Sequence, residues 1–290
     1  DYQIVMDNTL STTNGEVTPS VYNTSFTDET TAIMTLPLRI GYTLTGFTLS
    51  GFDGNVSVSD DLLTLTIQIG TYGNITLTPV WTANKYNIVF NGNGSTSGST
   101  ASMSMTYDKA QNLTANGFVK TGYKFAGWNT KSDGSGTAYT NKQSVKNLTS
   151  TDGGTISLYA QWTPITYTIK FDGNGNTGGS TSSMTMVYGV GKNLNANSFT
   201  RTSYEFLGWN TKKDGTGTDY DDRQYVNNLT STDGAVITLY AQWEHNYFTV
   251  SLTKVDSEDH QTLMGAEFGL YKYSDGDTPT IFLNSTEKYL

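Results

Sequence analysis

The stretch GWNTKSDGSGTAY at residues 127–139 returns 81 positions later as GWNTKKDGTGTDY at residues 208–220. A glycine-rich stretch that occurs twice can belong either to a ligand site lined with glycine or to the turns of a small fold. Aligned without a gap, residues 86–162 and 167–243 are identical at about 47 of 77 paired positions. Because repetition at a fixed period indicates tandem structural units, we interpret these segments as two copies of one domain.

A more diverged copy precedes these two in the chain. Trp81 stands 81 positions before Trp162, and Gly41 stands 81 positions before Gly122. After the last copy the repeated pattern stops. We therefore predict three repeats followed by a different, incomplete domain, with boundaries at residues 1–83, 84–163, 164–244 and 245–290.

Apolar residues alternate with polar ones at matching places in each copy, as half-buried strands require. One such strand begins at Tyr86 and another ends at Trp162. Between them lies the aromatic strand GYKFAGW, in which Gly127 predicts a β-bulge, as Gly208 does in the next copy. With 30 Gly, 19 Tyr and only 5 Pro, the composition favours short strands and tight turns. The predicted fold class is mainly β, and α+β at most.

The linkers between copies are short. Trp81 is followed after four residues by Tyr86, and Trp162 is followed after four residues by Tyr167. An extended linker of this length reaches only about 14 Å, which is too short for two copies to fold back face to face. We therefore expect small β-rich repeats arranged end to end.

The composition argues against several kinds of binding partner and of metal or disulfide chemistry. The 26 acidic residues outnumber the 17 basic ones, and the formal charge of -9 disfavours nucleic acid and anionic lipid as partners. Cysteine is absent, which excludes disulfides and thiolate metal sites. No apolar run approaches the roughly 18 residues of a membrane span, so we expect no membrane insertion. Because no signal segment stands at Asp1, we interpret the chain as a mature portion of a longer protein.

Three motifs stand in order between residues 86 and 162: Y-x-I-x-F-x-GNG, GYKFAGWNTKSDGSGTAY and NLTSTDGGTISLYAQW. With their equivalents at residues 167–243, they resemble the Listeria-Bacteroides repeat, the internalin-type B repeat of bacterial surface proteins. The first copy departs from this pattern, since Phe47 replaces the tryptophan and TLTPVW replaces LYAQW. The resemblance implies a β-grasp-like fold, mainly strands with at most one short helix, and an extracellular location on bacterial cell walls.

The segment FTVSLTKVDSEDHQTLMGAEFGLY, at residues 248–271, resembles the start of a collagen-adhesin B-type domain, which is prealbumin-like. The signature of that domain is a strand ending in L-T-K-x-D, followed by L-x-G-A-x-F-x-L-Y. Too few residues follow Trp243 for a whole β-sandwich, so we predict a partial β-sandwich at the C-terminus.

Lys254 is the one candidate modification residue. Alternation along FTVSLTK places it on the inner face of its strand, where an unpaired ammonium is costly. The resemblance implies that this lysine forms an isopeptide bond with an Asn or Asp on the last strand, aided by an acidic residue. Here the partner strand would lie beyond Leu290, and Glu267 is expected to face outward. The alternative is a lysine whose ammonium reaches solvent at the end of the strand.

Other patterns that suggest chemistry are incomplete. The loops GSGTAY and GTGTDY lack the helix N-terminus that a phosphate loop needs. Asp172, Asn174 and Asn176 imitate the opening of a calcium loop, but its glycine at position six and its acid at position twelve are missing. The two histidines, His245 and His260, lie outside the repeats, which disfavours histidine-based zinc or triad chemistry.

Aromatic and acidic side chains leave two alternatives to weigh. Trp128 and Trp209 could stack on sugars, but each follows an apolar strand in a small domain, which favours burial. Asp221 and Asp222 could act as paired carboxylates, but no acid stands at the matching positions of the preceding copy, which favours a surface turn. We therefore assign no catalytic residue, no cofactor and no metal ligand.

The expected function is that of a non-enzymatic segment of a bacterial cell-surface protein, acting as a monomeric stalk or adhesion module. Two alternatives remain open at this point. One is a repeat array that binds a host protein or glycan, and the other is an accessory region of a larger surface enzyme. The sequence names no ligand and no means of anchoring.

Overall fold

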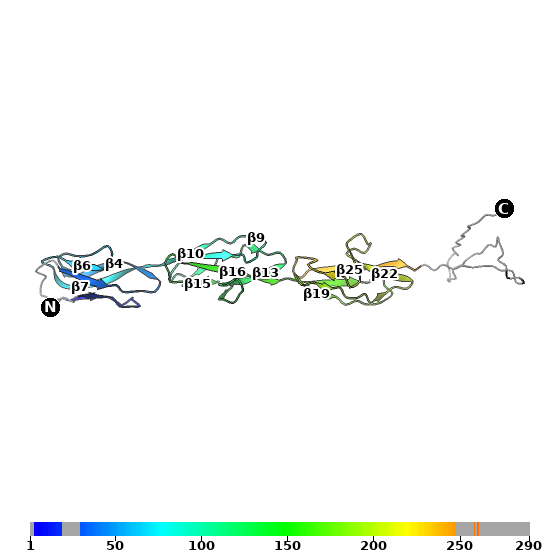
Figure 1. Cartoon of the computed structure of the whole chain (residues 1–290), viewed down its shortest axis with the longest axis horizontal. Helices are drawn as coiled ribbons and strands as arrows, with labels where there is room; N and C mark the ends of the chain where they lie inside the picture. The colour runs from blue at the N-terminus through cyan, green and yellow to red at the C-terminus, as the bar shows by residue number, and fades with distance from the viewer. Residues whose placement is uncertain (1–2, 19–29, 247–257, 259, 261–290) are drawn as a thin grey trace. The chain divides into compact units, whose positions relative to one another are not determined.

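The computed structural model describes residues 3–18 and 30–246 together with residues 258 and 260. Every regular element in these residues is a β-strand, which confirms the predicted fold class (Figure 1). The short helix that the family resemblance allowed does not occur in them, and none of them forms a helix able to cross a membrane.

The chain separates into two compact units. The larger contains the described residues up to Phe171 together with Ser182–Ala196 and Asp222–Leu239. The smaller contains Asp172–Thr181, Asn197–Asp221 and the described residues from Tyr240 onward.

The second repeat is built on one five-stranded sheet. Its strands stand in the order β10 (Met103–Thr106), β8 (Lys85–Asn91), β16 (Thr155–Pro164), β13 (Tyr123–Asn129) and β14 (Ala138–Tyr139). The first and last long strands, β8 and β16, are parallel neighbours, whereas the other pairs are antiparallel. Two short pairs complete the repeat, β11 (Gln111–Asn112) with β15 (Ser144–Val145) and β9 (Ser97–Gly98) with β12 (Phe118–Val119).

The third repeat follows the same plan. Its five-stranded sheet has the order β19 (Met184–Val187), β17 (Thr166–Asp172), β25 (Val236–His245), β22 (Tyr204–Asn210) and β23 (Asp219–Tyr220). Its short pairs are β20 (Lys192–Asn193) with β24 (Tyr225–Val226) and β18 (Gly178–Gly179) with β21 (Phe199–Thr200).

The first repeat keeps only the central part of this plan. Its three-stranded sheet has the order β1 (Ile4–Met6), β7 (Tyr72–Ala83) and β4 (Tyr42–Asp53), with β1 and β7 parallel. A separate four-stranded sheet has the order β2 (Glu16–Thr18), β3 (Thr30–Thr35), β6 (Thr64–Ile67) and β5 (Val56–Val58). This second sheet has no counterpart in the later copies.

The aromatic strand bulges at the predicted glycines. The register of β13 with β16 shifts between Phe125 and Gly127, and that of β22 with β25 shifts between Phe206 and Gly208. Gly127 has a φ of 142°, and a Cβ on it would stand 2.8 Å from the carbonyl oxygen of Tyr139. The glycine is therefore required by both the backbone conformation and the available space.

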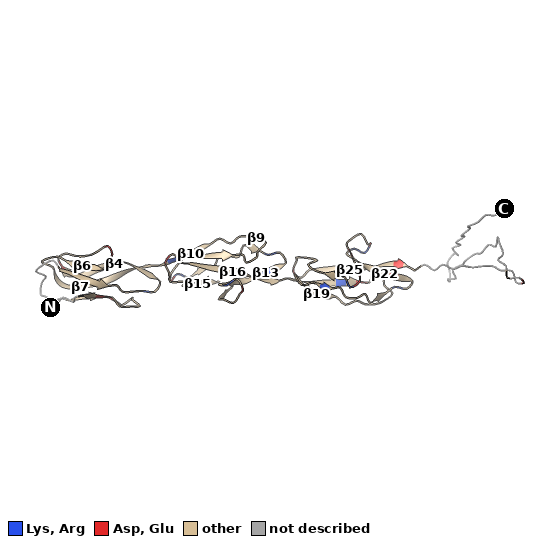
Figure 2. Ribbon diagram, in the orientation of Figure 1, with Lys and Arg blue, Asp and Glu red and all other residues tan. Residues whose placement is uncertain are grey.

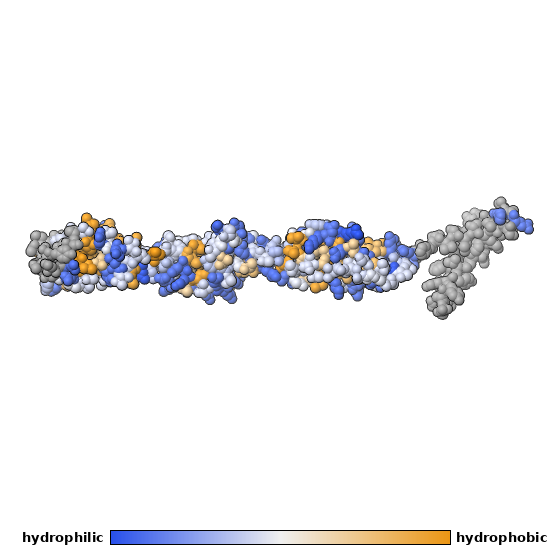
Figure 3. Space-filling model, turned by 90° about the horizontal axis from the view of Figure 1, so that it is seen from below, coloured by the Kyte–Doolittle hydropathy of each residue, from blue (hydrophilic) through white to orange (hydrophobic). Residues whose placement is uncertain are grey.

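Alternation along the strands builds one apolar core in the second repeat. Tyr86 and Ile88 of β8 face inward with Leu158 of β16, and Trp128 fills the centre of the cluster. Outside, charged residues are sparse and of both signs (Figure 2). On the face drawn in Figure 3, apolar residues form separate patches among polar ones.

Candidate functional site

The repeated phrase forms a loop that a buried asparagine closes. The Asn129 side chain is 3% exposed, and its oxygen accepts hydrogen bonds from the backbone amides of Lys131 at 2.9 Å and Gly136 at 3.0 Å. Its amide donates to the carbonyl oxygens of Gly134 at 3.0 Å and Gly136 at 3.2 Å. Asn210 makes three of the corresponding bonds in the third repeat, and its amide donates its other hydrogen bond to the Asp219 carboxylate. The phrase therefore specifies a turn, and these asparagines are structural residues that no pattern in the sequence had marked.

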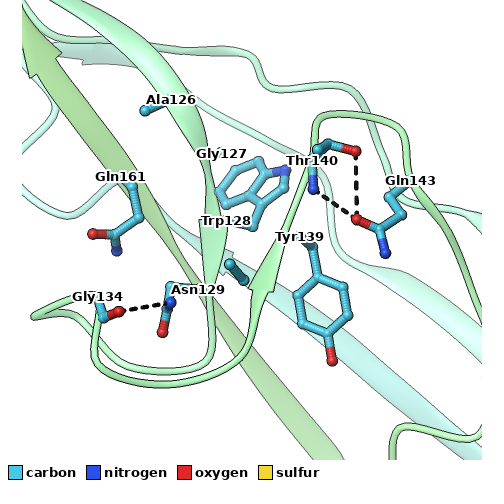
Figure 4. A pocket seen from close by; sticks show the side chains of 10 residues that line it. Ala126, Gly127, Trp128, Asn129, Gly134, Tyr139, Thr140, Gln143 and Gln161 are labelled. Atoms are coloured by element: carbon cyan, nitrogen blue, oxygen red, sulfur yellow. Dashed lines mark hydrogen bonds between the residues drawn. The ribbon is translucent and has the colours of Figure 1, made fainter.

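A cleft of about 320 Å³ lies beside this loop (Figure 4). Trp128, Tyr139, Thr140, Gln143 and Gln161 contribute to its lining. The oxygen of the Gln143 side chain accepts a hydrogen bond from the Thr140 amide at 2.8 Å. Burial raises the pKa of the Tyr139 hydroxyl. These neutral groups can donate and accept hydrogen bonds, but they include no nucleophile paired with a base.

Trp128 and Trp209 are core residues, as expected. Trp128 and Trp209 are fully buried, so their ring faces are not available for stacking on a sugar. The indole nitrogen of Trp128 has no hydrogen-bond partner in the described part of the chain. Trp162 and Trp243 are half-buried, and each donates a hydrogen bond of 2.9 Å to a backbone carbonyl, that of Gly92 or Gly173.

The residues that imitated a calcium loop serve hydrogen bonds within the protein, and the Asn174 side chain donates to the carbonyl oxygens of Lys213 and Ala241, both at 2.9 Å. The Asp172 carboxylate accepts a hydrogen bond from the Asn174 amide at 2.9 Å, and the Asn176 side chain donates to the carbonyl of Gly178 at 3.0 Å. Among residues 3–18, 30–246, 258 and 260, no cluster of three His, Cys, Asp or Glu side chains could hold a metal.

The remaining sequence candidates are scattered. His245 packs edge-on against the ring of Tyr204, with ring centroids 4.8 Å apart. Asp222 lies 3.8 Å from the guanidinium of Arg223, next to it in the chain. His260 is exposed. Lys254 and Glu267 lie outside the described residues, so the cross-link stays a prediction.

A recurring contact joins segments of neighbouring repeats within the larger compact unit. Gly41 has a φ of 77° and lies in a turn where the Tyr42 amide donates to the carbonyl of Arg39 at 3.1 Å. The carbonyl of Gly41 accepts a hydrogen bond from the amide of Asn84 at 2.9 Å. Because Asn84 lies in the linker to the second repeat, this bond ties the turn to the linker.

The ring of Tyr107, from the second repeat, lies directly on Gly41. A Cβ on that glycine would stand 2.3 Å from the ring, so no larger residue fits beneath it. Tyr107 packs edge-on against Tyr42 with centroids 5.9 Å apart, and its amide donates to the carbonyl of Asn84 at 2.8 Å. We call this contact joint 1.

The same contact recurs one repeat later. The ring of Tyr188 lies on Gly122, where a Cβ would again stand 2.3 Å from it. Tyr188 packs edge-on against Tyr123 with centroids 5.8 Å apart, and its amide donates to the carbonyl of Ile165 at 3.0 Å. The amide of Ile165 in turn donates to the carbonyl of Gly122 at 2.9 Å. We call this contact joint 2.

The two joints differ in their polar contacts. At joint 1 the Tyr42 hydroxyl donates to the Asp108 carboxylate at 2.9 Å, and hydrogen bonds from Asn147 and then Tyr42 lower the pKa of that carboxyl. At joint 2 Lys124 pairs with Asp233 at 3.1 Å, and this hydrogen bond lowers the pKa of the Asp233 carboxyl. Both acids are solvent-exposed, where such pairs contribute little stability. No pattern in the sequence predicts either joint.

The chain is similar to parts of two longer proteins of Evansella cellulosilytica. A protein whose name calls it a Gly-rich membrane protein is 37% identical over 134 residues, which cover 46% of this chain and 15% of the relative. A second, named as a membrane protein, is 26% identical over 128 residues, which cover 43% of this chain and 18% of the relative. The chain thus spans less than a fifth of the length of either relative.

A solved structure, that of the Bacillus anthracis TIE protein, aligns with 84% of this chain and 56% of its own, at 10% identity and a TM-score of 0.28. The repeats themselves match a known family. The Listeria-Bacteroides repeat domain matches residues 86–161 and again residues 167–242, together more than half of the chain, and the protein therefore belongs to the Listeria-Bacteroides repeat family.

Proposed function

We propose that this segment acts as a load-bearing stalk or adhesion module of a bacterial cell-surface protein and has no catalytic role. Listeria-Bacteroides repeats occur in surface proteins, and both relatives are named as membrane proteins. We place the segment outside the cell, at the wall, as a monomer.

The pairing of the first and last strands of a repeat carries the proposal. In the second repeat, β8 and β16 are parallel and paired from Asn87 with Thr155 to Asn91 with Tyr159. Tension applied where the chain enters and leaves the repeat pulls these strands past each other. The hydrogen bonds of a ladder lie across the strands, so in this geometry they share the load instead of breaking one at a time. The parallel pair of β1 and β7 gives the first repeat the same geometry.

Single-molecule pulling on one repeat tests this proposal. The chain contains no cysteine, so introduced cysteines can serve as the sole handles. One pair of handles, Lys85→Cys with Thr163→Cys, lies where the chain enters and leaves the repeat. Pulling on it loads strands β8 and β16 in shear. Handles from Lys85→Cys and Thr155→Cys lie at the same end of the two strands and peel them apart. We expect a clearly higher unfolding force for the first pair, and equal forces would contradict load bearing.

A second candidate function, binding of a host protein or glycan, is favoured by the cleft beside Trp128. Its lining combines an aromatic ring, that of Tyr139, with the neutral amides of Gln143 and Gln161, groups that suit a neutral polar ligand. The indole N–H signal of Trp128 in an NMR spectrum reports on this cleft. A shift on adding neutral oligosaccharides at millimolar concentration, lost in Gln143→Ala, supports binding, and an unchanged signal argues against it.

A further inference from the structure

Three equivalent turns, one in each repeat, can be compared residue by residue. At each turn a tyrosine amide donates to a carbonyl three residues earlier, at 3.1 Å in the first repeat, 3.0 Å in the second and 3.1 Å in the third. At each, the linker that follows the repeat donates an amide to the residue before the tyrosine, at 2.9, 2.9 and 2.8 Å. That residue is Gly41, Gly122 or Ser203.

The backbone conformation does not explain the two glycines. Gly41 and Gly122 have φ values of 77° and 76°, and Ser203 adopts nearly the same conformation with a φ of 63°. A serine therefore fits this turn at a modest cost in backbone strain. What separates the positions is space, because both glycines are buried, whereas Ser203 is exposed.

The rings of the following repeat account for this difference. Tyr107 lies on Gly41 and Tyr188 lies on Gly122, and in both cases a Cβ would come within 2.3 Å of ring atoms. The nearest atoms include Cγ, the ring atom closest to the tyrosine backbone, so a movement of the far end of the ring alone cannot make room for the Cβ. A side chain at this position of the turn therefore excludes the ring.

We propose that the turn residue and its tyrosine form a socket for one tyrosine ring of the following repeat, and that Ser203 closes this socket in the third repeat. The tyrosine sockets are thus Gly41 with Tyr42 and Gly122 with Tyr123, and the closed form is Ser203 with Tyr204. The partner that an open socket fits is a Listeria-Bacteroides repeat with a tyrosine at the position of Tyr107 or Tyr188. A repeat of this kind does not dock on the third turn.

The surroundings of the closed socket fit this assignment. Tyr204 has an edge-on aromatic partner from its own repeat, His245, with centroids 4.8 Å apart and planes at 79°. In the open sockets the edge-on partner of the equivalent tyrosine comes from the next repeat, with planes at 72° and 71°. The positions equivalent to His245 are Ala83 and Pro164, which have no aromatic ring.

The test transplants the serine into an open socket of the whole chain. In Gly122→Ser we expect the Tyr188 amide, which donates to Ile165 across joint 2, to exchange its hydrogen about tenfold faster. Exchange at Leu158, in the core of the second repeat, should stay unchanged and shows that the repeat is folded. Ser203→Gly is the matched control and should alter neither amide.

A double-mutant cycle separates the ring clash from backbone strain. On a Tyr188→Ala background the ring is gone, so adding Gly122→Ser should change exchange at position 188 less than about twofold. An equal effect of Gly122→Ser on both backgrounds would show that strain alone acts and would overturn the socket. No effect on either background would overturn it as well. If Gly122→Ser unfolds the repeat, Gly41→Ser with Tyr107→Ala repeats the cycle at joint 1.

Discussion

Asn129 concentrates four hydrogen bonds of its loop in one buried side chain. Replacing it with alanine removes the partner of two amides and two carbonyls of the loop at once, in partly buried hydrogen bonds. We expect Asn129→Ala to lower the free energy of unfolding by about 2–3 kcal/mol, measured by urea denaturation. Ser132→Ala in the same loop is the control, since Ser132 is exposed and its replacement should cost less than about 0.5 kcal/mol. Equal losses from both variants would contradict the role given to Asn129.

Trp209 is the largest fully buried side chain of its repeat. Its removal leaves a cavity that the short strands around it cannot fill, so Trp209→Ala should cost about 3–5 kcal/mol in the free energy of unfolding. Emission from Trp128 and Trp209 should be blue-shifted and resist aqueous quenchers. Ready quenching of both would instead revive the interpretation of these rings as sugar-stacking platforms.

The Asp108 carboxyl at joint 1 should titrate below its ordinary pKa, because the hydrogen bond from Asn147 and, less strongly, that from Tyr42 stabilise its charged form. Because its pKa is lower in the folded protein than in the unfolded chain, the ionised Asp108 carboxylate stabilises joint 1 fully at any pH above the unfolded pKa. That contribution is lost as the pH falls through the folded value. In an NMR titration, Asn147→Ala should raise the pKa of Asp108 more than Tyr42→Phe does. The reverse order would show that Tyr42 is the main partner.

At the scale of the strands, each repeat closes its core with its own first and last strands. All buried residues of the second core lie between Tyr86 and Ala160. We therefore expect residues 84–163 alone to fold and to melt in one cooperative transition, measured by circular dichroism or calorimetry. A disordered fragment would show that the contacts at joints 1 and 2 are required for folding and would contradict the predicted boundaries.

Long strands were predictable because alternation repeats over enough residues to be recognised. The strands that begin near Tyr86 and end near Trp162 are present, and so is the bulge at Gly127. Pairs such as Gln111–Asn112 with Ser144–Val145 are only two residues long and carry no periodicity. The separate sheet of the first repeat was not predictable either, because the later copies offer no template for it.

The joints could not be predicted from the sequence, for a different reason. Gly41 and Tyr107 are distant in sequence and meet only after two repeats have folded, so no local pattern marks their contact. Glycine at this position also reads as an ordinary turn residue. A glycine that only forms a turn and a glycine that leaves space for a tyrosine ring can be told apart by comparing Gly41 and Gly122 with Ser203. This comparison is possible only when the position of the ring is known.

At the scale of the whole molecule, the linkers and the sockets both restrict how far one repeat can bend relative to the next. Each linker has only four residues between the flanking aromatic residues, a reach of about 14 Å. Its third residue, Asn84 or Ile165, is hydrogen-bonded to both of the repeats that meet at the joint. A segment tied in this way has few bending conformations left, so we expect the repeats to lie end to end in solution.

Small-angle scattering of the whole chain should then give a rod-like profile, with a pair-distance distribution that peaks early and has a long tail. The double variant Gly41→Ser and Gly122→Ser keeps both linkers but removes both open sockets. It should therefore bend more freely and give a shorter maximum dimension. A compact profile for the unmodified chain would contradict the end-to-end arrangement. Identical profiles for the two proteins would mean that linker length alone sets the arrangement, since the tyrosine rings would then add no restraint.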